Sequence, residues 1–339
     1  MSVWLQTQWR TLSLWHVVLI PISWLFGAIV FIRKYLYQQG WLSSYRLAAP
    51  VIVVGNINVG GTGKTPLVIW LAEQLRQEGF SPGIISRGYG GSLSQVTEVF
   101  ANSNPEEVGD EPVLIAKRTH CPLFVGANRI AAGQALLQAH PQCNVIVSDD
   151  GLQHYALQRD VEIALVNSSQ QFGNQLLLPA GPLREKISRL QSVDAIVDSG
   201  DGATSAFYYK EDLQSPVFKM QLQGESFESL DGTQAKQPVS YFADKHLVAI
   251  AGIGNPDRFF NQLSSLGLQF ERKAFADHHA FVAKDLAQFS GKTIFMTEKD
   301  AVKCSALTMG DAWYLPVTAT VSSLSQTSLI TLILQKLRI

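Results

Sequence analysis

The sequence predicts an α/β protein in which a doubly wound parallel sheet is followed by a second, smaller α/β unit. Three observations favour this fold class. After Pro50, short runs rich in Val and Ile alternate with longer segments of helical periodicity, as in parallel sheets that helices cover on both faces. A glycine-rich turn, "VGGTGKT", joins the first of these strands to the first helix. The alternation stops around residues 207–245, where the sequence is polar and β-rich, and then resumes.

The first unit is predicted to consist of strands that alternate with helices and loops. Its strands are expected at "VIVVGN", "SPGIIS", "PLFVG", "CNVIVSDDG" and "VEIALVN", because short β-branched runs between turn signals are typical of buried strands. Its helices are expected over residues 66–77 and in "VGDEPVLIAKR" and "NRIAAGQALLQ". In the first of these helices apolar residues recur at helical spacing, and Pro66 lies near the first turn.

The second unit repeats this alternation on a smaller scale. "FYYKEDL", "PVFKMQLQGESFESLDG" and "QPVSYFADKH" predict a β-rich linker, which places the boundary between the units near residue 215. "HLVAIAGIG", "LQFERKAF" and "KTIFMTEKD" then predict strands, and helices are expected near residues 256–266 and 282–289. The segment "AGIGNP" lacks the third glycine of a dinucleotide-binding fingerprint and therefore predicts an ordinary strand-to-helix turn.

Composition limits the classes of function. The chain has 339 residues, 46% of them hydrophobic, and a formal net charge of −1. These values fit a folded, somewhat apolar protein and give no electrostatic sign of a nucleic-acid partner. Its three cysteines are scattered and odd in number, which favours ordinary thiols in a reducing compartment over a disulfide framework.

The start of the chain is apolar enough to associate with a membrane. Residues 11–32 contain no Asp, Glu, Lys or Arg, and a spanning helix needs about 20 such residues. Arg33 and Lys34 follow the run directly, whereas a single arginine precedes it, which predicts that the downstream chain faces the cytoplasm. The run is long and no small-residue cleavage site follows it, which argues against a signal peptide. A helix lying in the membrane interface and a buried core helix stay open as alternatives.

The turn after the first strand matches most of a phosphate-binding P-loop. Gly63, Lys64 and Thr65 form the end of the pattern G-x-x-x-x-G-K-[ST], whereas Asn58 stands where its first glycine is expected. Small residues let backbone amides point at phosphate oxygens, and the following helix adds its N-terminal dipole. A chance glycine-rich turn is the alternative, against which the flanking strand and helix argue. The predicted ATP-binding residues are Asn58, Gly60, Gly61, Thr62, Gly63, Lys64 and Thr65.

Two pairs of adjacent acids are candidates for chemistry. Asp149 and Asp150 end an apolar strand, where P-loop proteins place an aspartate that directs Mg²⁺, although adjacent acids also cap turns. Because neighbouring side chains of a strand face opposite ways, we expect only one of the two to reach the metal. Asp110 and Glu111 lie at a predicted helix start. Acids favour the helix dipole there, but a carboxylate at this position is also a candidate to accept a proton in phosphoryl transfer.

One histidine segment and three arginines complete the candidates. "FADHHAF" places His278 beside an aspartate, which is typical of a polarised pair, a metal site or a surface loop; no second cluster offers zinc spacing. Arg87, Arg129 and Arg184 lie in loops expected at the carboxyl ends of the strands, where such sheets bind ligands. Arginine suits bidentate contacts to phosphate, and an ordinary surface or capping role is the alternative for each.

Eight motifs follow one another in a specific order. They are "VGNINVGGTGKTP", "SRGYGG", "GDEP", "GANR", "SDDGLQH", "LLPAGPLRE", "DHHAF" and "TEKDAVK". With them the chain resembles the tetraacyldisaccharide 4'-kinase family, the kinases of the lipid A pathway. The resemblance extends from the hydrophobic N-terminal helix to Lys303, and residues after about 306 carry no such motif.

The resemblance implies a bacterial inner-membrane enzyme whose catalytic domains lie on the cytoplasmic face. Such kinases use ATP and Mg²⁺ to phosphorylate the 4'-hydroxyl of tetraacyldisaccharide 1-phosphate, an acylated lipid substrate, and thereby form lipid IVA. No obligate protein partner and no nucleic acid are implied. Pattern and resemblance together divide the chain into an N-terminal membrane-anchoring helical segment (1–45), a P-loop kinase domain (46–215) and a smaller C-terminal α/β domain with the β linker (216–339).

The resemblance also implies roles for single residues. Asp110 is the implied base and acts with His278, which hinge closure would bring to the P-loop. His279 carries no implied role. The implied catalytic set is Asp110, His278, Lys64, Asp149 and Asp150, and the predicted metal ligands are Thr65, Glu111 and Asp149. The residues predicted to bind substrate are Arg87, Arg129, Gln153, His154 and Arg184.

Two other functions compete with a lipid kinase. The first is a membrane-attached P-loop ATPase that regulates a partner protein. "VGGTGKT" is similar to the loop of those ATPases, but Val59 replaces the lysine that they use for dimer-dependent hydrolysis. The second is a module that binds nucleotide without turnover, and the two carboxylate pairs argue against it.

Overall fold

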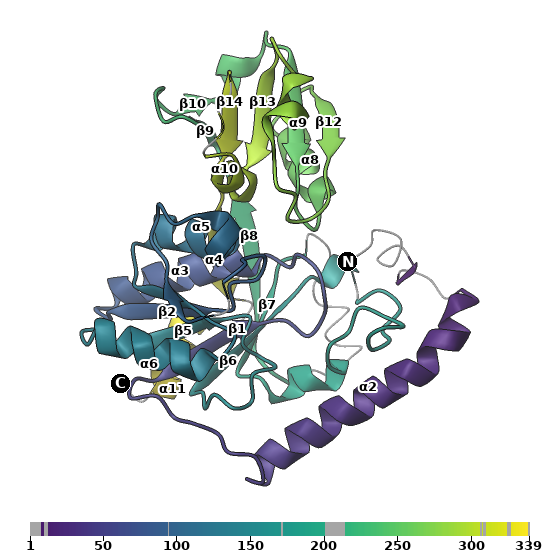
Figure 1. Cartoon of the computed structure of the whole chain (residues 1–339), viewed down its shortest axis with the longest axis vertical. Helices are drawn as coiled ribbons and strands as arrows, with labels where there is room; N and C mark the ends of the chain where they lie inside the picture. Colours follow the sequence, from purple (N-terminus) through teal and green to yellow (C-terminus); the bar gives the residue numbers. More distant parts are fainter. Residues whose placement is uncertain are drawn as a thin grey trace.

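Two β-sheets, each with its own helices, form the described part of the molecule (Figure 1). The computed structural model describes residues 8–9, 13–93, 95–170, 172–200, 214–305, 307, 310–323 and 327–337. The predicted linker segment "FYYKEDL" lies outside these residues. Figure 1 shows the smaller sheet standing at one end of the larger one, with helix α2 along the far side of the larger unit.

The larger sheet has nine strands in the order β15-β8-β7-β6-β1-β5-β2-β4-β3. The seven strands from β8 to β4 in this order pair in parallel, and only the two edge strands are antiparallel. The bounds are β1 Val51–Gly55, β2 Pro82–Ser86, β3 Thr97–Glu98, β4 Leu123–Val125, β5 Val145–Asp149, β6 Val161–Val166, β7 Ala195–Asp198, β8 Val217–Gln223 and β15 Thr318–Ser323.

Helices cover both faces of this sheet, as the sequence predicts for a doubly wound fold. Along β1, Ile52 and Val54 enter one hydrophobic core, and Val51 and Val53 enter the core on the opposite face. Alternation of this kind follows from the two-residue period of a strand. Helices α3, α5 and α11 contribute to the first core and α6 to the second. The bounds are α3 Lys64–Gln77, α4 Pro105–Val108, α5 Asp110–Thr119, α6 Arg129–Ala139, α11 Leu329–Leu337, η1 Ser168–Gln170 and η2 Ile187–Ser192.

The smaller sheet has six strands in the order β10-β9-β14-β13-β11-β12. Its core is rich in stacked and edge-on aromatic rings, among them those of Phe227, Phe242 and Trp313. The segment "KTIFMTEKD", predicted as a strand, changes to helix at Glu298, because Thr297 accepts the backbone N–H of Asp300 and caps the helix. The bounds are β9 Ser226–Ser229, β10 Gln237–Pro238, β11 Leu247–Ala251, β12 Glu271–Ala274, β13 Thr293–Thr297, β14 Ala312–Leu315, α8 Pro256–Ser265, α9 Ala283–Ala287, α10 Glu298–Cys304 and η3 Val239–Phe242.

The strand pairing does not follow a single boundary near residue 215. β8 lies in the larger sheet although it follows that position, and β15 returns to pair with β8 in antiparallel fashion. Helix α11 then packs into the core of the larger unit. We therefore propose that β8, β15 and α11 belong with the P-loop domain, whereas the predicted division assigns the whole of 216–339 to the C-terminal domain.

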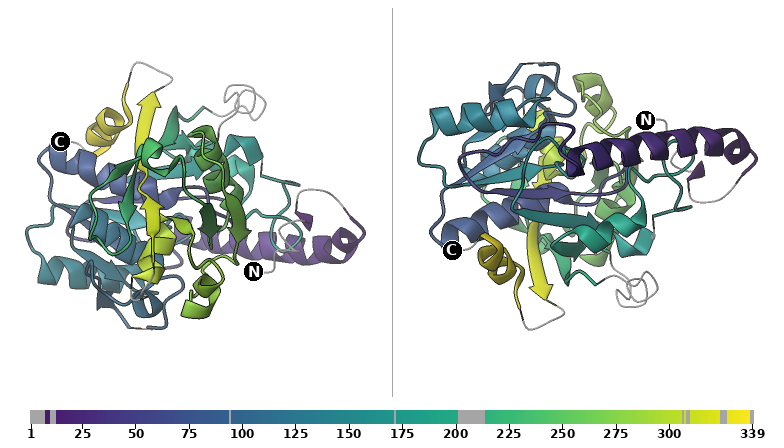
Figure 2. Two further views of the ribbon diagram at one scale, coloured as in Figure 1. Left: turned by 90° about the horizontal axis from the view of Figure 1, so that it is seen from above. Right: turned by 90° about the horizontal axis from the view of Figure 1, so that it is seen from below.

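Helix α2 (Trp15–Gln38) is long and apolar enough, by length and composition, to cross a membrane. Within it, only His16 and Ser23 are buried. Ser23 Oγ donates to the carbonyl oxygen of Leu177 (2.5 Å), which fixes the helix to a loop of the larger unit. Figure 2 shows the N-terminal end of α2 extending past the body of the protein. The first residues of the predicted apolar run, 11 and 12, lie outside the described residues.

Candidate active site

The loop between β1 and α3 is shaped by glycines at left-handed backbone angles. Gly60 has a φ of 123°, and Gly63, which caps α3, has a φ of 95°. Residues with a side chain rarely adopt such angles. A Cβ built on Gly60 would meet no atom within 4 Å, so the backbone angle rather than a lack of space requires this glycine. The loop leaves the carboxyl end of a central parallel strand, which is where doubly wound sheets bind ligands.

Buried polar side chains hold this loop and its lysine in place. Asn56 accepts a hydrogen bond from Lys64 Nζ (3.2 Å) and donates one to Thr62 Oγ1 (3.3 Å). Ser199 Oγ donates to the carbonyl oxygen of Thr62 (2.7 Å). Asn58 is also buried, and its Oδ1 has no hydrogen-bond partner among the described residues. The ammonium of Lys64 is thus oriented within the loop, by contacts to Asn56 that the motif alone does not predict.

The adjacent acids at the end of β5 have different surroundings. Asp149 is buried and accepts a hydrogen bond from Ser86 Oγ (2.9 Å), while its other oxygen, Oδ1, has no partner in the described part of the chain. Asp150 has a left-handed φ of 49°. Its carboxylate lies 3.0 Å from Arg184 Nη1 and 3.6 Å from Lys64 Nζ. The two side chains therefore engage different partners, as neighbouring side chains at a strand end do.

The electrostatic environment separates these two acids as well. Burial, together with the charges of Glu111 and Asp150, raises the pKa of Asp149 to about 6. Burial alone would also raise the pKa of Asp150, but Lys64 and Arg184 lower it below its usual value. A nearby cation would therefore stabilise the charged form of Asp149 more than that of Asp150, which already has two cationic partners.

The oxygen atoms near this strand end fit Mg²⁺. The unpaired Oδ1 of Asp149 and the hydroxyl of Thr65, in the first turn of α3, are hard oxygen donors. Mg²⁺ commonly takes one or two carboxylates and completes its shell with water and phosphate oxygens. Among the described residues, no group of three or more His, Cys, Asp or Glu side chains is arranged to hold a metal. A magnesium ion at this position would therefore depend on nucleotide oxygens for much of its coordination.

Gln153 and Arg184, both predicted to bind substrate, belong to one hydrogen-bond network. Gln153 Nε2 donates to Glu185 Oε1 (2.7 Å) and to the carbonyl oxygen of Asn56 (3.1 Å). Arg184 Nη1 donates to Gln153 Oε1 (3.4 Å). Glu185 is buried and also accepts a hydrogen bond from Tyr155. Glu185 directly follows Arg184 in "LLPAGPLRE". The motif alone did not predict that Glu185 would accept a hydrogen bond from Gln153.

The remaining predicted substrate-binding residues differ in exposure. Arg129 is buried at the start of α6 and donates to the carbonyl oxygen of Gly126 (2.8 Å). Burial lowers its pKa to about 10, which still leaves it charged at neutral pH. Burial and nearby arginines, Arg129 first, lower the pKa of His154 to about 4, so its ring is neutral at pH 7. Arg87, by contrast, directly follows β2 and is exposed.

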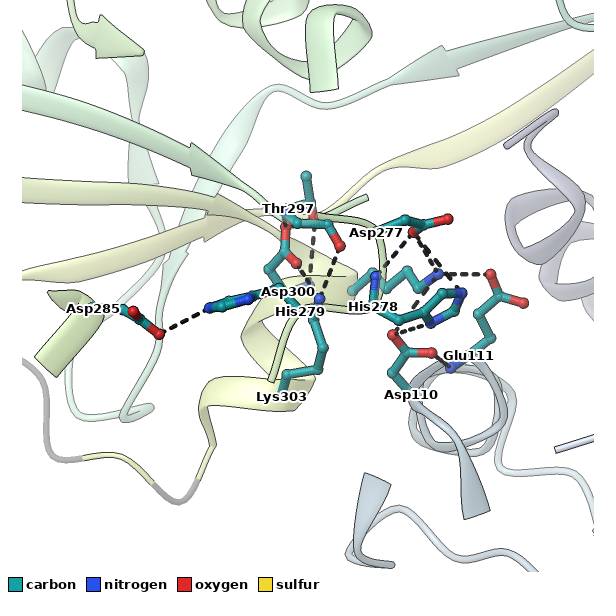
Figure 3. Close-up of polar contacts among 11 residues, drawn as sticks. Asp110, Glu111, Asp277, His278, His279, Asp285, Thr297, Asp300 and Lys303 are labelled. Carbon is teal, nitrogen blue, oxygen red and sulfur yellow. Dashed lines mark hydrogen bonds and ion pairs between the residues drawn. The ribbon is translucent and has the colours of Figure 1, made fainter. Parts of the chain in front are cut away.

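A side-chain hydrogen bond joins the two units at the predicted base. Asp110 is the first residue of α5, and its Oδ2 lies 3.1 Å from Nδ1 of His278, which is 168 residues further along the chain. Figure 3 shows this imidazole and carboxylate side by side. His278 lies in the loop between β12 and α9 with a left-handed φ of 57°. The ring of Tyr89, from "SRGYGG", meets the imidazole edge-on at a centroid distance of 5.2 Å.

Lys299, on α10, contacts this site although the sequence assigned it no role. Its Nζ lies 2.8 Å from Glu111 Oε1, 3.8 Å from Asp110 Oδ2 and 4.0 Å from Asp277 Oδ1. Burial alone would lower the pKa of Lys299, but Glu111 and the other two acids raise it, so it carries an ammonium. Burial alone would raise the pKa of Asp110, but the hydrogen bond to His278 and the charge of Lys299 lower it. Asp110 is therefore ionised at neutral pH and able to accept a proton.

The P-loop and the second unit meet at two glycines. A Cβ built on Gly254 would lie 3.4 Å from the backbone nitrogen of Gly61 and 3.2 Å from Asp277 Oδ2. Gly254 lies in the turn between β11 and α8, the segment "AGIGNP". This turn therefore lies close both to Gly61 of the P-loop and to Asp277, the neighbour of His278.

Comparison with known proteins identifies the family of this chain. Residues 15–338 match the protein family described as "LpxK: Tetraacyldisaccharide-1-P 4'-kinase". The chain belongs to this family. A protein of Methylobacillus flagellatus named tetraacyldisaccharide 4'-kinase is 48% identical over 318 residues, which is 94% of this chain and 92% of the relative. A protein of the same name from Dechloromonas aromatica is 48% identical over 341 residues, which is 99% of this chain and 97% of the relative.

A solved structure of the family has the same fold. The crystal structure of LpxK from Aquifex aeolicus in complex with ATP matches with a TM-score of 0.78 and 28% sequence identity, over 96% of this chain and 100% of that chain. Family membership confirms the predicted fold class and the predicted activity, an ATP-dependent 4'-kinase of lipid A biosynthesis that acts on a lipid disaccharide. The roles of individual residues stay predictions.

Proposed function

We propose that phosphoryl transfer takes place between the two units, where Asp110 accepts the proton of the 4'-hydroxyl of tetraacyldisaccharide 1-phosphate and lipid IVA is formed. The observation that carries this proposal is the 3.1 Å contact between Asp110 Oδ2 and His278 Nδ1. It sets a charged carboxylate of one unit against a ring of the other, beside the P-loop. A hydroxyl is a weak nucleophile, and a positioned base contributes about 10²- to 10⁴-fold to such a reaction.

His278 and Lys299 support Asp110 in this role. His278 contacts Oδ2, and the backbone N–H of Glu111 donates to Oδ1 (2.9 Å), so both oxygens of Asp110 are held in one orientation. Lys299 lies 3.8 Å from the same carboxylate and favours its charged form. An oriented, ionised carboxylate is what proton transfer from a hydroxyl requires.

The P-loop is the proposed nucleotide site. We assign its backbone amides and the ammonium of Lys64 to the phosphates of ATP. When bound, Mg²⁺-ATP supplies the phosphoryl group, and the metal neutralises charge on the phosphate oxygens. Thr65 and Asp149 would hold the metal, and Asp150 keeps Lys64 and Arg184 in place through its two ion pairs. Glu111, the third predicted ligand, is held by Lys299 and would have to part from it to reach the metal.

The lipid substrate is proposed to bind beside the carboxyl ends of the strands. Arg87 is exposed there, and the side chain of Arg184 is 29% exposed. Both can reach a sugar phosphate, for which guanidinium groups are well suited. Arg129 and His154 are more enclosed, so we assign them to the support of the strand-end acids and of the surrounding loop rather than to the phosphate itself.

The apolar helix α2 is proposed to hold the enzyme at the bacterial inner membrane, with both catalytic units on the cytoplasmic side. Large apolar side chains cover its surface, and Trp15, Trp24 and Phe31 are each at least 60% exposed. A helix with this surface would bury its apolar side chains in the bilayer. Arg33 and Arg46 lie beyond its apolar part, where they can attract anionic head groups. This placement would bring the site to the surface where the acylated sugar lies.

Separation of the P-loop and the base onto two units is proposed to favour transfer over hydrolysis. Lys64 belongs to the larger unit and His278 to the smaller one. Approach of the units would complete the site and exclude water from the phosphoryl group.

The test is transfer of γ-³²P from ATP to purified tetraacyldisaccharide 1-phosphate in detergent with Mg²⁺. We expect a labelled lipid with the native protein and loss of most of the label with Asp110→Ala, at nearly unchanged ATP affinity. Asp244→Ala, at an exposed acid of the smaller unit, is the matched control and should retain transfer. Free phosphate without labelled lipid would favour the ATPase switch. Equal loss of ATP binding in Asp110→Ala would contradict the role of this residue as a base.

A further inference from the structure

Helix α10 carries a buried ion pair that the proposed reaction does not use. Asp300 is fully buried, and the side chain of Lys303 is 8% exposed. Asp300 Oδ1 lies 2.6 Å from Lys303 Nζ. The ammonium also lies over the ring of Phe281, 5.1 Å from its centroid. Replacing a buried ion pair by apolar residues is often neutral or stabilising, so stability alone is a weak reason for this pair.

Both partners of this pair bind the backbone of the same residue, Gly252, which directly follows β11. Asp300 Oδ2 accepts the backbone N–H of Gly252 (3.1 Å), and Lys303 Nζ donates to the carbonyl oxygen of Gly252 (3.0 Å). A Cβ built on Gly252 would lie 3.2 Å from Asp300 Oδ1 and 3.2 Å from Lys303 Nζ. The absence of a side chain at this position allows the close approach, and the ion pair therefore fixes one strand end.

The carbonyl oxygen of Gly252 also anchors the loop of His278. It accepts the backbone N–H of His278 (3.2 Å). His278 is held at a left-handed φ of 57°, a conformation that costs energy for a residue with a side chain. A single backbone atom thus joins Lys303 to the residue whose ring contacts Asp110, and it helps to keep His278 in this conformation.

A helix cap does not account for the whole arrangement. The backbone N–H of Asp300 donates to Thr297 Oγ1 (3.1 Å), and Thr297 Oγ1 donates to Asp300 Oδ2 (2.7 Å), which is a reciprocal cap of α10. A cap of this kind requires neither Lys303 nor a contact to Gly252. Figure 3 shows the group formed by Thr297, Asp300 and Lys303 beside the Asp110–His278 pair.

We propose that Asp300 and Lys303 are positioning residues for phosphoryl transfer: they hold the backbone of Gly252, whose carbonyl oxygen in turn helps to hold His278 against Asp110. The inference rests on the proposed role of His278. Neither residue touches the reacting atoms, and both act through the backbone. Loss of the pair should leave the P-loop intact and let the imidazole of His278 move, and a displacement of about 1 Å can cost on the order of 10²-fold in rate.

The experiment measures lipid phosphorylation by Asp300→Asn and Lys303→Met in the full-length protein in detergent. We expect kcat to fall by about 10- to 100-fold, with the KM for ATP within about 2-fold of the native value because the P-loop is untouched. Lys303→Arg, which keeps the charge, should recover part of the loss. Asp285→Asn is the matched control: it breaks the 2.9 Å ion pair with His279 on the other side of the same loop and should change kcat by less than about 2-fold if contacts to Gly252 are what matters.

A double-mutant cycle with His278→Ala separates positioning from a general structural role. If Asp300 and Lys303 act through His278, their substitution should have little further effect once His278 is absent. Equal rate losses in the native and His278→Ala backgrounds would overturn the positioning role and leave the proposed reaction intact. A native rate in His278→Ala would overturn both the positioning role of Asp300 and Lys303 and the proposed role of His278 in the reaction. Where Asp300→Asn fails to fold, Lys303→Met, which keeps the helix cap, decides the question.

Hydrogen exchange gives a readout that does not depend on activity. The amide of His278 donates both to the carbonyl oxygen of Gly252 (3.2 Å) and to Asp277 Oδ1 (3.1 Å). It should exchange faster in Lys303→Met than in the native protein, because the first of these two acceptors is no longer held. Unchanged exchange at this amide would contradict the proposal even if the rate fell.

Discussion

The two sides of the proposed active site are built in different ways. The nucleotide side is one continuous segment, β1, the glycine-rich loop and the start of α3. Its lysine is held by Asn56 of that segment and by Asp150 after the neighbouring strand β5. The acceptor side consists of pieces that lie far apart in the chain: the start of α5, the loop of His278 and the start of α10. Local backbone geometry therefore creates the first side, whereas the second exists only where the two units meet.

This difference has a consequence for catalysis. The larger unit alone contains the P-loop residues, so nucleotide binding should tolerate changes at the contact between the units. The proposed base, Asp110, its histidine partner and Lys299 come from both units, so proton transfer should be sensitive to those same changes. Substitutions can therefore impair one side of the site and leave the other in place.

The largest expected effect is on the nucleotide side. Among the described residues, Lys64 carries the only ammonium that contacts both Asn56 and Asp150. We expect Lys64→Ala to lower kcat/KM for ATP by about 100-fold or more, because a positioned positive charge stabilises the negative charge that develops in the transition state by this amount. Steady-state kinetics and calorimetric ATP binding check this prediction. Lys284→Ala, at an exposed position of α9, is the control. Unchanged turnover in Lys64→Ala would contradict the assignment of the phosphate loop.

The next effect concerns the contact between the units. Arg118 on α5 forms two 2.8 Å hydrogen bonds with Glu298 on α10. Arg118→Met leaves a largely buried carboxylate without its partner, and we expect the free energy of unfolding to fall by about 2 kcal/mol with little change in the KM for ATP.

The matched control for this prediction is an exposed ion pair of the smaller unit. Lys292→Met breaks the 2.6 Å contact to Glu271, and a change below about 0.5 kcal/mol is expected because solvent screens such pairs. Denaturant unfolding of both variants, with ATP kinetics, makes the comparison. Equal losses in the two variants would show that the Arg118–Glu298 contact stabilises the fold no more than an exposed ion pair does.

The smallest effect is a pH dependence of stability within the larger unit. The pKa of His154 is lowered to about 4 by burial and by nearby arginines, from an ordinary value of 6.5. Between these values the unfolded chain binds a proton that the folded protein does not, so the free energy of unfolding falls as the pH drops from 6.5 towards 4. After a discount for the partial exposure of the ring, this amounts to about 1 kcal/mol at pH 5.

Thermal or denaturant unfolding of His154→Gln from pH 7 to pH 5 tests this prediction. The variant should lose less stability than the native protein over that interval, because its side chain does not titrate. His246→Gln, at an exposed position of the smaller unit, is the control and should follow the native curve. A native pH dependence in His154→Gln would show that other groups cause the loss.

Local sequence patterns predicted the elements of the larger unit well. The strand "VIVVG" and the glycine-rich turn appear where expected, and α3 begins at Lys64, two residues before the predicted start, because Gly63 takes the left-handed cap position. The prediction is less complete where a strand ends and a helix begins at once. In "TEKDAVK" the cap at Thr297 starts α10 where the end of a strand was predicted. As a result, Lys299 contacts Glu111 of the larger unit, whereas Asp300 accepts the backbone N–H of Gly252 in the smaller unit.

By itself, the sequence determined the doubly wound sheet, the phosphate loop, the apolar N-terminal helix and the family, since each depends on residues close together in the chain or on motifs in a fixed order. Only the tertiary structure decided that β15 returns to the larger sheet and α11 to its core, that Lys299 lies between Asp110 and Glu111, and that Lys303 holds the carbonyl group that anchors His278. The physical reason is that these contacts join residues far apart in the chain. Their geometry is set by how two cores pack and how buried charges find partners, which no local periodicity encodes.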